Sequence, residues 1–332
     1  GLLTLMFGVG LEIQRRSALR NGRAWPGHYP WRAALLLLDG ALHYLLVVQF
    51  DVLMGYAVTG LIVAYLLATR ETTQRRWMVA AGSIHLVGLT LVTVALVRWS
   101  AAGNGASTAL DPNPYADGSW TDLVRFRIDN VVLFRLEPVL ITGLSIAMFL
   151  LGARLVRAGV LDASGHRLRV RLLKLGVAAF VLDLCLGLFG GAAGVVFARY
   201  GTAPVVALGL LAVVVELMSR SGSDRPAARW LGQVGRMALS CYVLQNVIAS
   251  ALCYGWGLGL AARMPDHLRV PGTIALYLAV AAAVTLIAHL WLRRFPRGPV
   301  ELAWVAAYEA ITSRLPAPRS QHVSESAPVS RG

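Results

Sequence analysis

Long apolar runs separated by short polar segments dominate the chain. A helix needs about 20 apolar residues to cross the roughly 30 Å hydrocarbon core of a bilayer, at about 1.5 Å per residue. Eight runs approach or exceed this length, and they predict an all-α transmembrane bundle with eight full spans. The predicted spans are residues 31–50, 52–69, 77–97, 131–153, 175–198, 203–218, 237–256 and 272–292.

A ninth apolar run covers residues 1–13 and would reach only about 20 Å as a helix. We interpret it as an N-terminal partial helix, the end of a helix whose beginning precedes Gly1. Together with the eight spans it makes residues 1–297 one transmembrane helical domain.

Three segments do not fit the spanning pattern. Residues 99–130 are rich in Gly, Asn, Asp and Pro and predict a long outer loop. Residues 298–313 carry an apolar stripe opposite Glu301 and Glu309, which is typical of a helix lying in the inner membrane interface. From residue 314 to 332, Pro, Ser and charged residues predict a disordered cytoplasmic tail.

The composition supports a lipid environment. Hydrophobic residues make up 57% of the 332 positions and charged residues only 14%, whereas soluble proteins average about 25% charged residues. A soluble fold of this size needs more polar residues to cover its surface. The composition therefore excludes a soluble globular protein.

The net charge of +14 would suggest a nucleic-acid partner for a soluble protein. If each predicted span crosses the membrane once, however, 24 of the 31 basic residues fall on one side. Cytoplasmic loops hold most of the Arg and Lys residues of membrane proteins. The charge therefore indicates a multi-pass protein of the cell inner or plasma membrane, with a cytoplasmic C-terminus. It argues against nucleic acid as a partner and for contact with the lipid bilayer.

Ionisable residues at membrane depth are costly and mark candidate functional sites. Asp39 and His43 lie four residues apart, on one face of the first predicted span. A carboxylate bonded to the imidazole would raise its basicity, as a general base requires. Alternatively, the two side chains only satisfy one another or a neighbouring helix. Asp51, in the outer turn that follows, is either part of this site or a cap of the next helix.

Other polar side chains at membrane depth form a second group of candidates. They either line a wet cavity or bond neighbouring helices. They are Tyr56, Asp183, Arg236, Tyr242, Gln245 and Asn246. The three cysteines, Cys185, Cys241 and Cys253, show no metal-ligand spacing, and there is no phosphate-binding loop or nucleophile elbow. We predict no metal site and no permanently bound cofactor.

Four short motifs occur in order along the chain. They are LMFGVGL at 5–11, His43 with DVLMGYA at 51–57, GRMALSCYVLQ at 235–245 and RGPVE at 297–301. Together they resemble the YeiB-like bacterial membrane proteins, whose C-terminal half is known as domain of unknown function 418. The resemblance covers nearly the whole chain. Two departures are Asp39, where a glycine or apolar residue is usual, and Ser240-Cys241, which replaces a Thr-Asn pair.

This family is similar, more distantly, to integral-membrane acyltransferases of the heparan-glucosaminide acetyltransferase and sugar O-acyltransferase kind. The resemblance implies transfer of an acyl group from cytoplasmic acyl-CoA, as a co-substrate, to a glycan or lipid acceptor of the cell envelope. It implies that His43 is the base and that Arg15, Arg16 and Arg32 lie near the CoA phosphates. Such relatives usually carry an initial helix with an Asp-x-x-Arg-Gly-like motif, which would precede Gly1.

Two other functions remain open at this point. A transporter or lipid-moving protein would use the intramembrane residues Asp183, Glu216 and His289 and would not consume acyl groups. A non-catalytic membrane scaffold would have no cavity leading to the outer loop.

Overall fold

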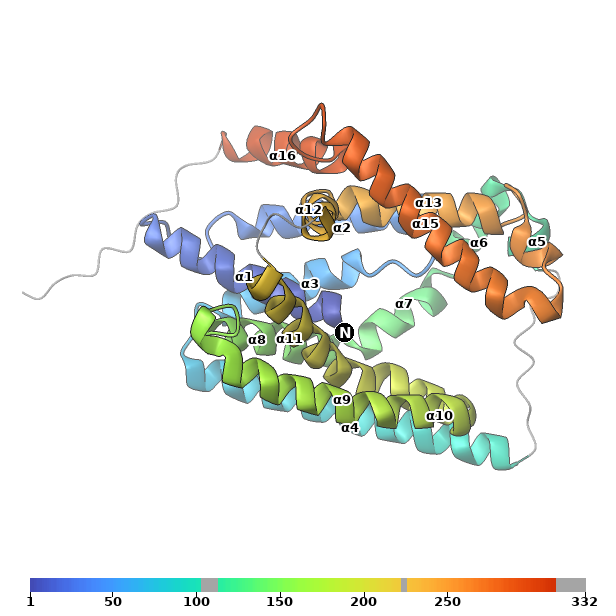
Figure 1. The fold of residues 1–332 in the computed structure, drawn as a ribbon, viewed down its shortest axis with the longest axis horizontal. Coiled ribbons are helices and arrows are strands. Elements are labelled where there is room, and N and C mark those ends of the chain that lie inside the picture. The colour runs from blue at the N-terminus through green and yellow to red at the C-terminus, as the bar shows by residue number, and fades with distance from the viewer. Residues whose placement is uncertain (103–112, 222–225, 315–332) are drawn as a thin grey trace, which may run out of the picture.

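The structure is a computed structural model that describes residues 1–102, 113–221 and 226–314 (Figure 1). Every regular element in these ranges is helical, which confirms the all-α prediction. The first half holds α1 (Leu2–Arg20), α2 (Tyr29–Leu46), α3 (Leu53–Leu66), α4 (Glu71–Ala101), α5 (Pro114–Asp117), α6 (Trp120–Asp129), α7 (Val131–Leu140) and α8 (Thr142–Arg157). The second half holds η1 (Ala163–Gly165), α9 (His166–Phe189), α10 (Gly191–Phe197), η2 (Ala198–Thr202), α11 (Ala203–Ser221), α12 (Pro226–Arg236), α13 (Ala238–Cys253), α14 (Leu260–Arg263), η3 (Asp266–Leu268), α15 (Arg269–Trp291) and α16 (Pro299–Thr312).

Length and apolarity identify four to six candidate membrane spans among the described residues. Four are apolar helical stretches, at 71–101, 163–189, 191–219 and 266–291. The other two are bent pairs, because α7 meets α8 at 43° and α12 meets α13 at 87°. The remaining two predicted runs are also helical, but α3 has only 14 residues and the 18 residues of α2 include Arg32, Asp39 and His43.

Proline and glycine residues interrupt two of the predicted spans. The run 131–153 is divided between α7 and α8, three residues after Pro138, which lacks a backbone N–H for the helical ladder. The run 175–198 is divided between α9 and α10 at Gly190 and Gly191, and Gly191 has a φ of +57°.

The predicted outer loop at 99–130 contains helices α5 and α6. Helix α12 lies in a segment for which the sequence predicted no element. The capping box of Ser119 and Asp122 explains where α6 begins. Residues 103–112 of the predicted loop and 315–332 of the predicted tail lie outside the described residues.

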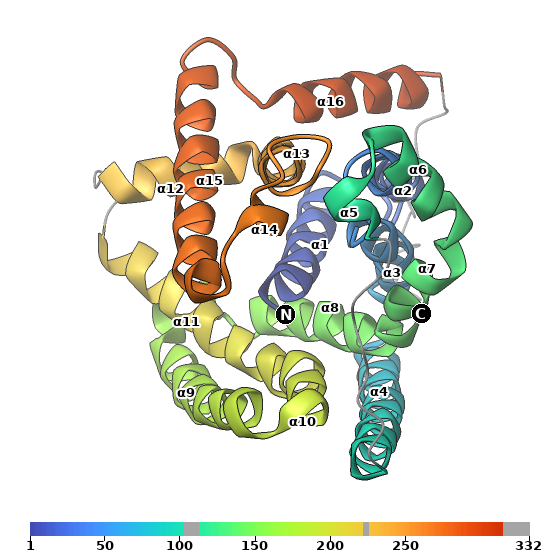
Figure 2. The same cartoon turned by 90° about the vertical axis from the view of Figure 1, so that its right-hand side faces the viewer.

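Helix α1 packs closely against α8 at the centre of the bundle (Figure 2). A Cβ atom on Gly8 would stand 2.0 Å from the Phe149 carbonyl oxygen, and one on Gly152 would stand 2.3 Å from the Leu5 carbonyl oxygen. Only glycine permits this approach of two backbones, which gains van der Waals contact inside a membrane. Helices α1, α3 and α8 share one buried core around Phe149, to which α2 and α4 also contribute.

Helix α16 caps the N-terminal end of α13. The Glu301 carboxylate accepts hydrogen bonds from the backbone N–H groups of Leu239 (2.8 Å) and Ser240 (3.1 Å) and from the Ser240 hydroxyl. The Ser240 Oγ atom in turn accepts from the backbone N–H of Val300 at 3.0 Å. Since the first N–H groups of a helix have no partner within it, this reciprocal capping explains why the motifs at 235–245 and 297–301 occur together.

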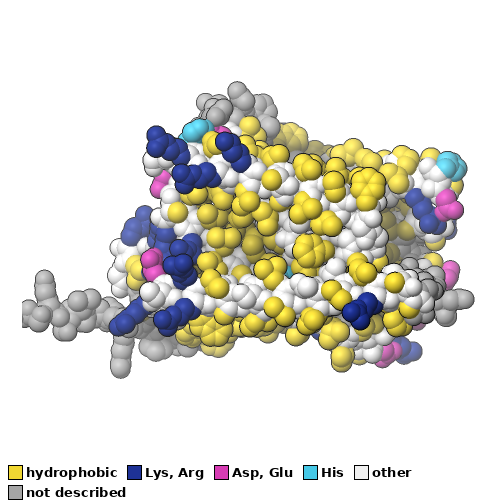
Figure 3. Space-filling model, turned by 90° about the horizontal axis from the view of Figure 1, so that it is seen from below, with side chains coloured by type: hydrophobic (Ala, Val, Ile, Leu, Met, Phe, Trp, Pro, Cys, Tyr) yellow, Lys and Arg dark blue, Asp and Glu magenta, His cyan; other side chains and the backbone are white. Residues whose placement is uncertain are grey.

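The outer surface is apolar between its two ends (Figure 3). Large side chains such as Ile84 (72% exposed) and Tyr277 (71% exposed) face outward from the long helices. Lys and Arg side chains gather at the end of the molecule where α1 finishes. Apolar surface of this extent would be unfavourable in water, so the fold is that of a membrane protein.

Candidate functional site

His43 and Asp51 form a buried pair at the junction between α2 and α3. His43 lies in the last turn of α2 and is 3% exposed, and Asp51 precedes α3 and is 2% exposed. The His43 Nδ1 atom lies 3.0 Å from Asp51 Oδ1. The other carboxylate oxygen accepts a hydrogen bond from the backbone N–H of Met54 at 3.0 Å. Asp51 therefore contacts the imidazole with one oxygen and caps the first turn of α3 with the other.

Tyr242 and Asn246 contact this pair from α13. The Tyr242 hydroxyl lies 3.4 Å from Asp51 Oδ1, and its ring centroid is 4.8 Å from that of the imidazole. The Asn246 amide nitrogen lies 3.2 Å from His43 Nε2. If Nδ1 donates its hydrogen to the carboxylate, Nε2 carries the lone pair that accepts from the amide. In that tautomer Nε2 is the ring nitrogen that can take a proton, as a general base does.

Asp39 is not the partner of His43, although their four-residue spacing predicted that they would pair. Its Oδ2 atom is buried and has no hydrogen-bond partner among the described residues. The reason is the tight α2–α3 hairpin. A Cβ atom on Gly40 would stand 2.6 Å from the Met54 nitrogen and 2.8 Å from Asp51 Oδ2, so the turn brings the Asp51 carboxylate directly against α2.

Helix α6 anchors the end of α2 that carries the pair. Arg127 is 1% exposed, and its guanidinium donates hydrogen bonds to the carbonyl oxygens of Leu45 (2.8 Å) and Val47 (3.0 Å). The Tyr44 hydroxyl donates to the Arg127 carbonyl oxygen at 2.6 Å. The last carbonyls of a helix have no partner within it and favour a cation nearby. The position of His43 therefore depends on a side chain from the predicted outer loop.

Replacing Arg127 with Met is expected to destabilise the protein by about 3 kcal/mol, because two buried carbonyl groups lose their donors while the side-chain length is kept. The measurement is thermal unfolding of the protein in detergent. Arg125→Met is the matched control, since Arg125 is exposed on the same helix and should have little effect. Equal unfolding temperatures for the two variants would contradict the anchoring role.

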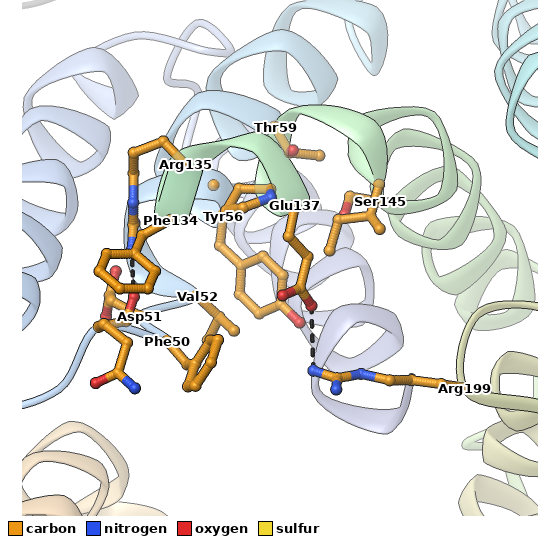
Figure 4. Close-up of a pocket in the computed structure, with 14 residues that line it drawn as sticks. Phe50, Asp51, Val52, Tyr56, Thr59, Phe134, Arg135, Glu137, Ser145 and Arg199 are labelled. Carbon is orange, nitrogen blue, oxygen red and sulfur yellow. Dashed lines mark hydrogen bonds and ion pairs between the residues drawn. The ribbon is translucent and has the colours of Figure 1, made fainter. Parts of the chain in front are cut away.

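A pocket of about 90 Å³ lies on the Asp51 side of the pair (Figure 4). Arg135 and Glu137 line it from α7, and Arg199 closes one side through a 3.1 Å ion pair with Glu137. Arg135 donates to the Gln49 carbonyl oxygen at 2.5 Å and has no carboxylate within 4 Å among the described residues. We call this the outer pocket. It combines charged side chains with aromatic and aliphatic walls.

A second pocket lies at the N-terminal end of α2, between the end of α1 and α16. Arg23 and Arg32 line it, and we call it the basic groove. Arg32 donates to Gln14 Oε1 at 2.7 Å, and its guanidinium lies 4.9 Å from the Tyr308 ring centroid. The groove is open, polar and on the opposite end of α2 from His43.

Arg15 and Arg16, which were predicted to lie near CoA phosphates, bind a buried carboxylate instead. Glu12 is fully buried on α1, and its oxygens lie 3.0 Å from Arg15 Nε and 3.2 Å from Arg16 Nε. Arg157 of α8 approaches the same carboxylate at 3.6 Å. The spacing of three and four residues along α1 brings these side chains together. Among the three predicted arginines, Arg32 alone lines the basic groove.

The polar residues predicted to line a cavity or bond neighbouring helices lie in different parts of the structure. Tyr242 and Asn246 reach the pair, and Tyr56 lines the outer pocket. Gln245 is exposed, because one residue of helix turns it about 100° away from Asn246. Asp183 accepts a hydrogen bond from Thr202 at 2.6 Å, which joins α9 to η2, and Arg236 lies beside Glu301 in a separate pocket.

The sequence did not place Gln49, Glu12, Arg127 or Arg135 among the candidate site residues. Arg127 and Arg135 belong to the seven basic residues that the predicted topology places on the outer side. Their presence on the side with few basic residues was the signal in the sequence for a structural or binding role. Among the described residues, no group of three or more His, Cys, Asp or Glu side chains is arranged to hold a metal ion.

The fold and the site together define an all-helical membrane protein with a buried histidine–carboxylate pair. Residues 155–309 match the family described as Protein of unknown function (DUF418). This region contains the motifs at 235–245 and 297–301, whereas His43 and Asp51 lie before it. The match confirms the resemblance indicated by the four motifs.

Two relatives cover the region before residue 155 as well. YxaH of Bacillus subtilis (strain 168), described as an uncharacterized protein, is 26% identical over 332 residues, covering 92% of this chain and 78% of the relative. YeiB of Escherichia coli (strain K12), also described as uncharacterized, is 28% identical over 320 residues, covering 91% of this chain and 79% of the relative. No solved structure matches the chain at a significant level.

Proposed function

We propose that the protein is a membrane acyltransferase that moves an acyl group from acyl-CoA to a hydroxyl group on a glycan or lipid of the cell envelope. The observation that carries this proposal is the buried His43–Asp51 pair, in which Nδ1 faces the carboxylate and Nε2 faces the Asn246 amide. A base of this kind activates a hydroxyl nucleophile.

In the proposed reaction the acceptor oxygen attacks the carbonyl carbon of the thioester while His43 Nε2 takes the hydroxyl proton. A C–O bond forms and the C–S bond breaks. The imidazolium then returns the proton to the departing CoA thiolate. Asp51 stabilises the positive charge that develops on the imidazole. Because Asn246 bonds Nε2 at 3.2 Å, the acceptor has to displace this amide before it can react.

In this proposal the basic groove binds the CoA moiety. Arg23 and Arg32 supply positive charge for the phosphates, and Trp25 and Tyr308 offer aromatic rings beside them. Arg15 and Arg16 are not included, because both are paired with Glu12 and neither lines the groove. Arg32 and His43 are eleven residues apart on α2, a distance of about 16 Å along the helix axis, which the acyl-pantetheine arm has to bridge.

The proposal places the basic end of the bundle in the cytoplasm, with the C-terminus on the same side. It treats the eight predicted runs as eight crossings, including the short α3 and the polar α2 inside the bundle. The 24 basic residues that fall on one side of this topology support the orientation, and the plasma membrane is the membrane that exposes this end to cytoplasmic acyl-CoA.

The experiment that tests the proposal is binding of acetyl-CoA to the purified protein in phosphatidylcholine nanodiscs. We expect saturable binding that Arg32→Gln weakens about tenfold, the effect of losing one charge-assisted contact of about 1.4 kcal/mol. Arg20→Gln is the control, because Arg20 is an exposed arginine at the same end of the molecule and does not line the groove. Absence of saturable binding, or equal affinity in both variants, would reject the proposed donor site.

A transporter or lipid-moving protein is the second candidate function. Two pockets at opposite ends of α2 favour it. The intramembrane residues that suggested transport support it less, because each has a partner within the protein. Asp183 bonds Thr202, Glu216 pairs with Arg169 and His289 bonds Gln233. Flux in proteoliposomes without release of CoA thiol would establish this function in place of acyl transfer.

A further inference from the structure

We infer that the outer pocket is a binding site for the uncharged, hydroxyl-bearing headgroup of a membrane amphiphile. The inference goes beyond acyl transfer, because the pocket would bind such a molecule whether or not a reaction follows. It rests on two buried polar atoms without partners, on the balance of charge in the pocket and on its apolar walls.

Two polar atoms near the pocket lack hydrogen-bond partners among the described residues. Gln49 is 6% exposed, and its side-chain Oε1 atom is buried and accepts no hydrogen bond. The Nε–H group of Arg135 is buried and donates none. Both residues line the outer pocket. A buried polar group without a hydrogen-bond partner is costly. A ligand that accepts a hydrogen bond from Arg135 and donates one to Gln49 would remove this cost.

A hydroxyl group fits both atoms, because it donates one hydrogen bond and accepts others. A carboxylate or phosphate would satisfy Arg135 but would not donate to Gln49. An ammonium group would donate to Gln49 but could not accept from Arg135. A headgroup with one or more hydroxyls is therefore the chemistry that completes the pocket.

The charges of the pocket also favour an uncharged headgroup. Two carboxylates, Asp51 and Glu137, and two guanidinium groups, Arg135 and Arg199, line it, so their formal charges cancel. Glu137 is already bonded to Arg199 at 3.1 Å and to the Tyr200 hydroxyl at 2.5 Å. An added anion would find a counter-charge in Arg135 but would also face both carboxylates, and an added cation would face both guanidinium groups.

The rest of the pocket is suited to a hydrocarbon chain. Its other walls include Phe50, Val52, Phe134 and Ile141, and the Phe50 side chain is 59% exposed. Helix α7, which forms one wall, presents further exposed apolar side chains on its outer face, with Val139 68% exposed. Helix α7 belongs to the bent pair with α8 that counts as one candidate span, so an acyl chain can leave the pocket along α7 into the bilayer.

The outer pocket adjoins the His43–Asp51 pair through a shared residue. Asp51 lines the pocket with one side and holds His43 with the other. A hydroxyl group in the pocket would therefore lie beside the carboxylate of the pair. A soluble polyol would make the same hydrogen bonds, but it would leave the apolar walls uncovered.

The test uses the intact chain in phosphatidylcholine nanodiscs with a photoactivatable glucosyl-diacylglycerol as probe. We expect saturable labelling of the segment 131–145, competed by unlabelled glucosyl-diacylglycerol but not by phosphatidylglycerol or free glucose. Gln49→Leu is expected to lower the affinity about tenfold, since it removes one hydrogen bond to the headgroup. The unfolding temperature of this variant should be equal or higher, because the replaced oxygen has no partner within the protein.

Two controls separate this inference from acyl transfer. Gln245→Leu removes an exposed glutamine that does not line the pocket, and it should leave labelling unchanged. His43→Gln should also bind the probe normally, even if it abolishes turnover. Unsaturable labelling, equal labelling of Gln49→Leu and the unaltered protein, or full competition by phosphatidylglycerol or free glucose would overturn the inference. None of these results would bear on the binding of acetyl-CoA at the basic groove.

Discussion

Replacing His43 with Gln is expected to lower acyl transfer by about 10²–10⁴-fold, the usual contribution of a positioned general base. Glutamine keeps much of the side-chain volume and can still donate to Asp51, so the α2–α3 turn should persist. It has no nitrogen lone pair to take a proton from the acceptor. The measurement is release of CoA thiol from acetyl-CoA by proteoliposomes made with total envelope lipid of a bacterial host.

His267→Gln is the matched control, because His267 is exposed on η3 and touches neither pocket. It should retain the rate of the unaltered protein. Asp51→Asn should lose activity as well, since an amide oxygen can still accept from Met54 but cannot stabilise an imidazolium as a carboxylate does. Turnover of His43→Gln within twofold of the unaltered protein would refute the role of His43 as base.

Replacing Gly8 with Val is expected to prevent normal assembly of the bundle, at a cost of about 3 kcal/mol or more. Even a Cβ atom at this position would stand 2.0 Å from the Phe149 carbonyl oxygen and 2.6 Å from the Phe149 Cα atom. Those atoms belong to the backbone of α8, which cannot move aside as a flexible side chain can. Helices α1 and α8 would have to separate, and the core around Phe149 would lose contacts. The measurement is the yield of monodisperse protein and its unfolding temperature in detergent.

Gly10→Ala is the control for this prediction. Gly10 lies two residues further along the same helix, and a Cβ atom there would meet nothing within 4 Å. Alanine is about 1 kcal/mol more favourable than glycine inside a helix, so this variant should be as stable as the unaltered protein or more so. If Gly8→Val and Gly10→Ala behave alike, the contact between α1 and α8 does not determine assembly.

Much of the helical architecture followed from patterns along the chain. All eight apolar runs are helical in the structure, because apolar length depends only on consecutive residues. The breaks at Pro138 and at Gly190–Gly191 interrupt two of them, and both follow from residues that weaken a helix. Helix α12 was missed because its apolar residues are too few for a span and its ends carry charge.

The site was predicted only in part. His43, Asp51, Tyr242 and Asn246 were all candidates, since polar residues stand out in apolar helices. Their arrangement did not follow from sequence, because helical spacing favours Asp39 as the partner of His43. The tight packing at Gly40 brings Asp51 to His43 instead.

The sequence by itself therefore determined the class of protein, its helices and the residue types that carry chemistry, because these depend on local composition and periodicity. The tertiary structure decided which residues meet. It joined His43 to Asn246 across 203 positions and Glu301 to Ser240 across 61. It also paired Arg15 and Arg16 with Glu12 and left the Gln49 Oε1 atom without a hydrogen-bond partner beside a pocket. Such contacts depend on how helices cross in space, and no pattern along one helix specifies the side chains that another helix brings to it.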